Sequence, residues 1–446
     1  MITGDDRAIW RTIEPEAVTN QSCPDLQIDR SVSPGDEEFG IATDGRIGYA
    51  LPEIRVYGMK IERIIARPLK RGSPLDRGTS PRASIPPGGD GGNTLSRYRE
   101  FSGRARDPGG SGPPALCLAI AGDGTWGMGI TDFSGAVVPL INEYFAPMIE
   151  GGNALATERL WDLMFRHASV PGVGGIVSYA ISAIDLALWD LKGKLLQRPV
   201  YELLGGPAHA ETFCYATGHD VAWMLESGFE AVKLPCFLGE AQGIVALERI
   251  EQKVAHAREM IGPERELMLD CWVAGDVEFM VRLGERLRPY GLKWLEDYLY
   301  PEDFASYEEL RRRLPWQTLA TGERWFTHLP FGEAAARRTV DIFQPDVRWV
   351  GGVTACIKIG HIAEGAGLQV ALHGGVNDSF GQHLCHAMPS NMWGELYIDS
   401  APGIPLEEGW RPTPGMAIPK DGRLVPPATP GFGIELTRDE LEAMTD

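Results

Sequence analysis

The sequence predicts an α/β protein in which a parallel (β/α) barrel follows a small α+β domain. In the second half of the chain, eight short apolar runs alternate with longer helical patterns, which is typical of a barrel of parallel strands. Before them, a hairpin signal is followed by three helical patterns. A doubly wound open sheet is the alternative fold. It would place its site at a single switch point, and would not explain the polar residues that recur from strand to strand.

The expected elements of the α+β domain lie within residues 54–180, after an acidic, polar extension at 1–53 that lacks sustained periodicity. Its strands and helices are expected at 54–68, at the hairpin 115–132 around Asp123 and Gly124, and at 136–149, 157–168 and 176–196. The stretch 71–114 is rich in Gly, Pro, Ser and Arg. A loop of this length inside a compact protein indicates a lid or disorder.

The barrel is expected over residues 181–398. Its eight strands are expected at 212–217, 229–235, 266–270, 291–296, 317–323, 340–346, 368–373 and 394–398. The helices between them are expected at 246–262, 277–290, 304–314, 331–339 and 354–367.

Charge and composition exclude several classes of function. The chain has 446 residues and a formal net charge of −19, so nucleic acid and anionic membranes are not expected partners. A bound divalent cation would let so acidic a protein hold an anionic substrate. The first six residues show no signal-peptide pattern, and no apolar run reaches the ~18 residues of a membrane span. A cytoplasmic enzyme is therefore expected, with its seven scattered cysteines reduced.

Polar residues recur at the ends of the expected strands. They are Lys233, Asp270, Glu296, Glu323, Asp346, His373 and Glu395, and the intervals from Asp270 onward are 26, 27, 23, 27 and 22 residues. The carboxyl ends of barrel strands converge on one face, where active sites are built. Any one of these residues is explained equally well by a cap in a loop. Their even spacing instead indicates a shared site.

The residue types indicate the chemistry of that site. Asp270, Glu296 and Glu323 offer only hard oxygen ligands, a set that suits Mg²⁺. Asp346 and His373 end consecutive strands, so the carboxylate would orient the imidazole as a general base. With Lys233 available to steady an anion or to transfer a proton, the set describes proton abstraction beside a carboxylate.

These residues lie in stretches that resemble the mandelate racemase group of the enolase superfamily, and most closely its L-rhamnonate dehydratase branch. The matching stretches are 180–206, 215–218, LMLDCW at 267–272, 290–297, 321–323, QPDVRWVGGVT at 344–354, 372–375 and 430–439. The resemblance implies an α+β capping domain over a modified (β/α)₇β barrel, with residues 399–446 returning to the capping domain. It also implies a homo-oligomer.

The resemblance also implies roles for the residues. Asp270, Glu296 and Glu323 would hold Mg²⁺. His373, oriented by Asp346, would remove the C2 proton of a sugar acid and help expel the C3 hydroxyl, giving a 2-keto-3-deoxy acid. The expected substrate is an aldonate such as L-rhamnonate or L-lyxonate. Lys233 matches the single lysine of the branch, and Pro235 stands where racemases carry a second lysine.

Positions that would contact the substrate depart from the branch. Arg324 stands directly after Glu323, where the branch usually has histidine. The expected lid contains Arg97 and Arg104, which are candidate contacts for the substrate carboxylate, and Glu395 is a further candidate. The alternatives are a racemase, epimerase or cycloisomerase of the same superfamily, or a barrel that binds a sugar acid without converting it.

Overall fold

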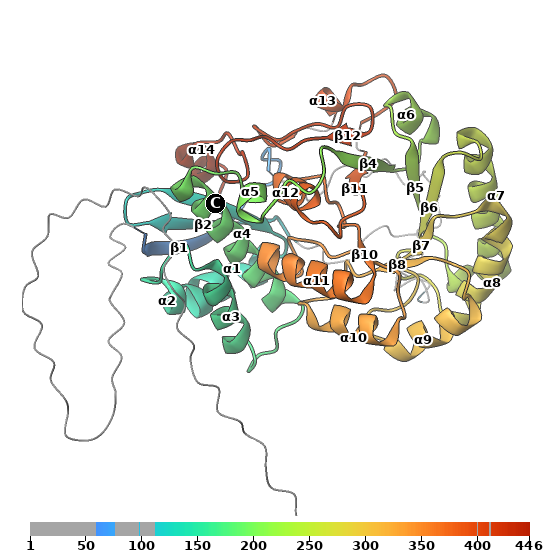
Figure 1. The fold of residues 1–446 in the computed structure, drawn as a ribbon, viewed down its shortest axis with the longest axis horizontal. Coiled ribbons are helices and arrows are strands. Elements are labelled where there is room, and N and C mark those ends of the chain that lie inside the picture. The colour runs from blue at the N-terminus through green and yellow to red at the C-terminus, as the bar shows by residue number, and fades with distance from the viewer. Residues whose placement is uncertain (1–58, 76–97, 99–111, 399, 410–411) are drawn as a thin grey trace, which may run out of the picture. The chain divides into compact units, whose positions relative to one another are not determined.

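The computed structural model describes residues 59–75, 98, 112–398, 400–409 and 412–446. The expected extension at 1–53 and most of the expected lid, including Arg97 and Arg104, lie outside these residues. The described chain contains a three-stranded sheet and a curled parallel sheet that carries helices on its outer face (Figure 1). The predicted fold class is confirmed.

The three-stranded sheet is antiparallel and follows chain order. It consists of β1 (Ile61–Pro68), β2 (Ala115–Ala121) and β3 (Trp126–Thr131). The predicted hairpin joins β2 to β3, and the side chain of Asp123 accepts a hydrogen bond from the Thr125 N–H at 2.9 Å. Gly124 has a φ of +85°, a conformation that favours glycine.

Helices follow this sheet, and the longest of them lies directly on it. They are α1 (Ser134–Pro139), the π-helical turn Leu140–Phe145, α2 (Ala146–Ile149), α3 (Thr157–His167), α4 (Ile176–Leu196) and α5 (Val200–Leu203). Helix α4 is buried along most of its length, as expected for a helix that is apolar on all sides. It continues across residues 180 and 181, where the sequence places the domain boundary.

Two glycines allow β3 to lie against α4. A Cβ atom on Gly127 would lie 2.2 Å from the Leu191 nitrogen, and one on Gly129 would lie 2.1 Å from the Ala183 oxygen. Both obstacles are helix backbone, which cannot rotate away as a side chain can. The missing side chains therefore set the distance between sheet and helix.

Each expected barrel strand is present. They are β4 (Thr212–Thr217), β5 (Ala231–Pro235), β6 (Glu266–Asp270), β7 (Trp294–Glu296), β8 (Leu319–Thr321), β9 (Ile342–Phe343), β10 (Gln369–Val370) and β11 (Gly394–Tyr397). They pair in parallel in the order β10-β9-β8-β7-β6-β5-β4-β11. A bridge from Val370 to Asn391, three residues before β11, links the two ends of this order. Large side chains such as Tyr215, Met268 and Trp294 fill the interior.

Helices cover the outside of the parallel sheet (Figure 1). They are α6 (Val221–Glu226), α7 (Gly243–Ile261), α8 (Val277–Leu287), α9 (Phe304–Arg313), α10 (Leu329–Arg337), α11 (Gly352–Ala366) and α12 (Ser379–Ala387). Four of them begin after an aspartate whose side chain accepts a backbone N–H of the first turn, namely Asp220, Asp276, Asp303 and Asp378. These caps explain where the helices start.

The last part of the chain contains α13 (Leu406–Gly409), β12 (Arg423–Leu424) and α14 (Arg438–Ala443). Strand β12 pairs antiparallel with β4. The Asp446 N–H donates to the Pro68 carbonyl at 3.1 Å, so the end of the chain lies beside the end of β1. Within the described ranges, no helix has both the length and the apolar composition that a membrane crossing needs.

Candidate active site

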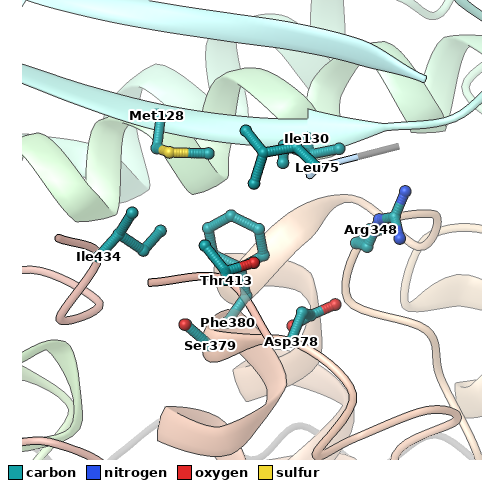
Figure 2. Close-up of a pocket in the computed structure, with 9 residues that line it drawn as sticks. All are labelled: Leu75, Met128, Ile130, Arg348, Asp378, Ser379, Phe380, Thr413 and Ile434. Atoms are coloured by element: carbon teal, nitrogen blue, oxygen red, sulfur yellow. The ribbon is translucent and has the colours of Figure 1, made fainter. Parts of the chain in front are cut away.

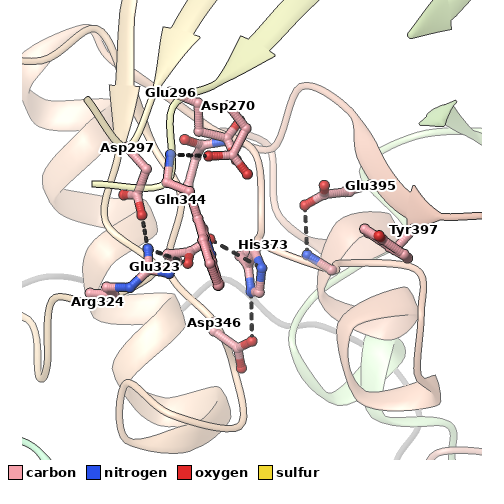
Figure 3. Close-up of polar contacts among 12 residues, drawn as sticks. Asp270, Glu296, Asp297, Glu323, Arg324, Gln344, Asp346, His373, Glu395 and Tyr397 are labelled. Carbon is pink, nitrogen blue, oxygen red and sulfur yellow. Dashed lines mark hydrogen bonds and ion pairs between the residues drawn. The ribbon is translucent and has the colours of Figure 1, made fainter. Parts of the chain in front are cut away.

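Most of the described site residues that the sequence predicts lie at or just beyond the carboxyl ends of the barrel strands (Figure 3). Lys233 and Glu395 instead lie within their strands, as the third of five residues of β5 and the second of four residues of β11. Asp270 and Glu296 are the last residues of β6 and β7 and face each other in register. Glu323 lies two residues beyond β8, and His373 lies three residues beyond β10. Strand ends therefore bring residues far apart in sequence to one place.

Asp346 and His373 form the predicted pair. The Nδ1 atom of His373 lies 2.8 Å from Oδ2 of Asp346, and the imidazole donates to the carboxylate (Figure 3). The other oxygen of Asp346 accepts the Arg348 N–H at 2.7 Å. The second ring nitrogen of His373, Nε2, lies 3.1 Å from Oε2 of Glu323. The ring nitrogen that Asp346 leaves unengaged, Nε2, therefore faces the carboxylate of Glu323.

The electrostatics of His373 follow from these neighbours. Burial lowers its pKa, but the field of Glu323 and the hydrogen bond to Asp346 outweigh burial and raise the pKa to about 10. Part of this rise in pKa comes from the negative charge of Glu323, and a cation bound to Glu323 would reduce that part. The imidazole is therefore less basic when Glu323 is neutralised.

Lys233 is buried between two carboxylates. Its side chain is 1 % exposed, and its Nζ atom contacts Glu296 and lies 2.7 Å from Oε1 of Glu395. Burial lowers the pKa of Lys233, but the two carboxylates outweigh burial and raise the pKa well above its usual value. Lys233 is thus a fixed positive charge.

Glu395 is held from three sides. Its Oε1 atom accepts from the Thr217 hydroxyl and from Lys233, and its Oε2 atom accepts the Gly374 N–H at 2.8 Å. Burial raises the pKa of Glu395, but the fields of Lys233 and His373 and the hydrogen bonds from Lys233 and Thr217 together outweigh burial and lower the pKa to about 2. Glu395 therefore links Lys233 to the backbone beside His373.

Arg324 occupies the position after Glu323. Its guanidinium contacts the Asp297 carboxylate, and its Nη1 atom lies 2.5 Å from Oε1 of Glu323 (Figure 3). The guanidinium also lies 5.8 Å from the centre of the Trp272 ring. Arg324 is therefore anchored at the mouth of the barrel, beside the carboxylates.

Three carboxylates form a negative cluster that fits a cation. Asp270, Glu296 and Glu323 sit on neighbouring strands, and the last two are almost completely buried. Burial, with the fields of Asp270 and Glu296, raises the pKa of Glu323 to about 8. Such mutual repulsion is relieved by a divalent cation with oxygen ligands.

In the part of the chain that is described, no three His, Cys, Asp or Glu side chains are already arranged around one metal position. Lys233 engages Glu296, while Arg324 and His373 engage Glu323. The carboxylates are therefore balanced by the protein's own cations. A metal ion would compete with these three side chains for the same oxygens.

Sequence reasoning missed several residues of the site, three of which contact its central side chains. Gln344 donates to Oε2 of Glu296 at 2.7 Å, Asp297 anchors Arg324, and the Trp349 ring packs against His373. Gln344 lies two residues before the predicted Asp346, and Asp297 directly follows the predicted Glu296. Proximity to predicted strand ends is the signal that would have found them.

A small cavity of about 20 Å³ lies between β3 and the start of α12 (Figure 2). Met128 and Ile130 line it from β3, and Arg348 and Asp378 line it from the barrel. The Nη2 atom of Arg348 lies 3.1 Å from Oδ1 of Asp132, just beyond β3. The segment that carries Asp346 is therefore in contact with the end of the three-stranded sheet.

Comparison with known proteins identifies the family. The profile for the N-terminal domain of mandelate racemase and muconate lactonizing enzyme matches residues 114–205, and the enolase C-terminal domain-like profile matches residues 217–440. The chain belongs to the enolase superfamily. Within it, the matched N-terminal domain assigns the chain to the mandelate racemase group.

Proteins similar to this superfamily member include two named as rhamnonate dehydratases and one named as a cycloisomerase. It is 38 % identical over 326 residues to L-rhamnonate dehydratase of Saccharopolyspora erythraea, covering 71 % of this chain and 81 % of that protein. The structure of rhamnonate dehydratase from Gibberella zeae complexed with Mg has 25 % identity and a TM-score of 0.78, covering 86 % of this chain and 96 % of that one. The 3,6-anhydro-D-galactonate cycloisomerase of Zobellia galactanivorans has 28 % identity and a TM-score of 0.65, covering 75 % and 94 %.

Proposed function

We propose that this enolase superfamily member is a Mg²⁺-dependent hydro-lyase that dehydrates a sugar acid to a 2-keto-3-deoxy acid. Its relatives named L-rhamnonate dehydratase support this reaction class, as does the Mg complex of one of them. The proposed substrates are aldonates such as L-rhamnonate or L-lyxonate. The proposal also retains the cytoplasmic location and the homo-oligomeric state that the sequence predicts.

One observation favours dehydration over racemisation. Racemisation requires a base on each face of the substrate, and this site has His373 on one side and Lys233 on the other. Lys233 is held by Glu296 and Glu395, and its raised pKa keeps it protonated. A protonated lysine cannot remove a proton. The His373–Asp346 pair is therefore the single base of the proposed reaction.

Asp270, Glu296 and Glu323 are the residues proposed to hold Mg²⁺. When bound, Mg²⁺ supplies a Lewis acid that stabilises negative charge developing on the substrate carboxylate. For Glu323 to serve as a ligand, the contacts of Arg324 and His373 with its oxygens must lengthen. This frees the Nε2 atom of His373 for the substrate.

His373 is proposed to act twice. Its Nε2 atom takes the proton from C2, and the electron pair left behind forms the C2–C3 double bond as the C3–O bond breaks. The same Nε2 proton is returned to the leaving hydroxyl, which departs as water, and the enol product becomes the 2-keto-3-deoxy acid. Asp346 keeps the proton of Nδ1 in place throughout, and so holds one tautomer.

The remaining predicted residues are proposed to bind and orient the substrate. Arg324 offers positive charge at the barrel mouth, and Lys233 offers a second one opposite His373. Glu395 is proposed to contact the substrate while it holds Lys233. Arg97 and Arg104 remain predictions from the sequence as contacts for the substrate carboxylate.

The test is a screen of purified protein with Mg²⁺ against mono- and diacid sugars, with 2-keto products detected as semicarbazones. We expect at least one aldonate to give product, with activity lost in EDTA and restored by Mg²⁺. His373→Asn should abolish turnover, whereas His361→Asn, at an exposed position on α11, should not. Turnover by His373→Asn at the wild-type rate would refute the assigned base.

The similarity to a cycloisomerase favours one alternative, an isomerisation within the same superfamily. Reaction in D₂O separates the two. Deuterium at C2 of recovered substrate, without keto-acid formation, would indicate epimerisation. A product of unchanged composition would indicate cycloisomerisation. Loss of water would indicate dehydration.

A further inference from the structure

Trp349 lies against the imidazole of His373. The two ring centres are 5.1 Å apart, and the ring planes are inclined by 37°. The indole also stacks on Tyr179 of α4, with ring centres 5.8 Å apart and planes inclined by 21°. Trp349 therefore joins the proposed base to helix α4.

Hydrogen bonds fix Trp349 from outside the barrel. Its indole N–H donates to Oδ2 of Asp132 at 2.8 Å, and its carbonyl accepts from the Ser178 hydroxyl at 2.7 Å. The neighbouring residue, Arg348, is held in the same way. Its guanidinium contacts Oδ1 of Asp132, and its carbonyl accepts from the Thr131 hydroxyl at 2.7 Å.

The packing of Trp349 adds a restraint on the orientation of the His373 imidazole beyond the polar contacts of its two ring nitrogens. The imidazole turns about its Cα–Cβ and Cβ–Cγ bonds, and two polar contacts oppose that turn, from Nδ1 to Asp346 and from Nε2 to Glu323. A metal ion on Glu323 would compete with the second contact, so the bond to Asp346 alone would then remain. The side chain of His373 is 27 % exposed, so the remaining packing leaves room for such rotation. The Trp349 ring occupies one of the directions into which the imidazole would turn.

We propose that Trp349 is a positioning residue whose ring fixes the orientation of the His373 ring plane. Asp132, just beyond β3, in turn fixes the orientation of the Trp349 indole. The proposal rests on the proposed function, because the role of His373 as base belongs to that function. It adds that the geometry of the base depends on a residue outside the barrel. A misplacement of about 1 Å at a reacting group can lower a rate by about 10²-fold.

The kinetic test compares four variants with wild type on the sugar acid found in the screen. Trp349→Leu removes the ring and should lower kcat by about 10²-fold while KM changes by less than about threefold. Trp349→Phe keeps an aromatic ring and should recover much of kcat. Asp132→Ala should lower kcat in the same direction but less. Trp316→Phe, at a half-buried tryptophan before β8, is the matched control and should leave kcat unchanged.

A readout without turnover keeps this proposal separate from the function. The His373 ring signal, assigned by its absence in His373→Asn, is followed by NMR in protein labelled at histidine. In Trp349→Leu we expect that signal to shift and broaden, because the ring samples several orientations, while other histidine signals stay in place. Mg²⁺ affinity by calorimetry should stay within about twofold of wild type.

Each outcome decides one of the two proposals. If wild type converts no sugar acid and the His373 signal broadens in Trp349→Leu, the proposed function fails and the positioning role stands. If wild type is active and Trp349→Leu keeps both kcat and a sharp His373 signal, the positioning role is wrong. A fall in kcat with an unchanged signal also overturns it, because Trp349 would then act by another route.

Discussion

Replacing Gly129 by alanine should destabilise the protein through the contact between β3 and α4. The new Cβ would lie 2.1 Å from the Ala183 carbonyl oxygen and 2.9 Å from the Ala187 nitrogen. Ordinary contact distances are about 3.5 Å, so strand and helix must separate by about 1.4 Å. Overpacking of this kind costs about 3 kcal/mol.

The matched control is Gly122→Ala in the same hairpin, where an added Cβ meets no atom within 4 Å. Thermal unfolding at one fixed scan rate, followed by circular dichroism, measures both variants against wild type. Gly129→Ala should unfold several degrees lower, and Gly122→Ala should stay within about 0.5 kcal/mol of wild type. Equal midpoints for the two variants would refute the claim that glycine sets the distance between sheet and helix.

Three further predictions concern charge. His383 is buried, and burial with the field of His386 lowers its pKa to about 3. The unfolded chain therefore binds more protons between pH 6.5 and 3, and this residue removes about 3 kcal/mol of stability by pH 4. His383→Gln should flatten the stability profile between pH 4 and 6.5, and a slope equal to wild type would contradict this. Lys233→Met should lower the metal-free stability by about 3–5 kcal/mol, because Glu296 and Glu395 lose their buried counter-charge. The loss, measured by urea unfolding in EDTA, should shrink when Mg²⁺ is added, and an equal loss in both buffers would argue against a cation at Glu296. Mg²⁺ at a hundredfold excess over Kd should raise the free energy of unfolding of wild type by about 2.7 kcal/mol relative to EDTA. The unfolding temperature should rise accordingly, and an unchanged midpoint would argue against the metal site.

The barrel was predictable because its signals are local. Each strand of a parallel barrel is a short apolar run, and each of these runs ends at or near a polar residue such as Asp270 or Glu296. Spacing alone then places those residues on one face. The long, mainly apolar pattern at 176–196 likewise matches helix α4, because a helix that is buried on all sides needs apolar residues on each of its faces.

Contacts between distant segments were not predictable in the same way. Asp132 and Trp349 are 217 positions apart, and nothing in either neighbourhood indicates that they meet. The contact of Arg324 with Asp297 was also missed, because the sequence shows a charge at a strand end but not the direction in which its side chain turns. For Lys233, too, the sequence does not show the direction of the side chain. The structure places it between the carboxylates of Glu296 and Glu395, which favours a fixed positive charge over a group that transfers protons.

The contacts that fix Trp349 bear on how such an enzyme can be redesigned. They come from Asp132, Ser178 and Tyr179, none of which lies on a barrel strand. If Trp349 positions His373 as proposed, a substitution at any of these three positions can change the rate of proton transfer while every residue at the barrel strand ends stays the same.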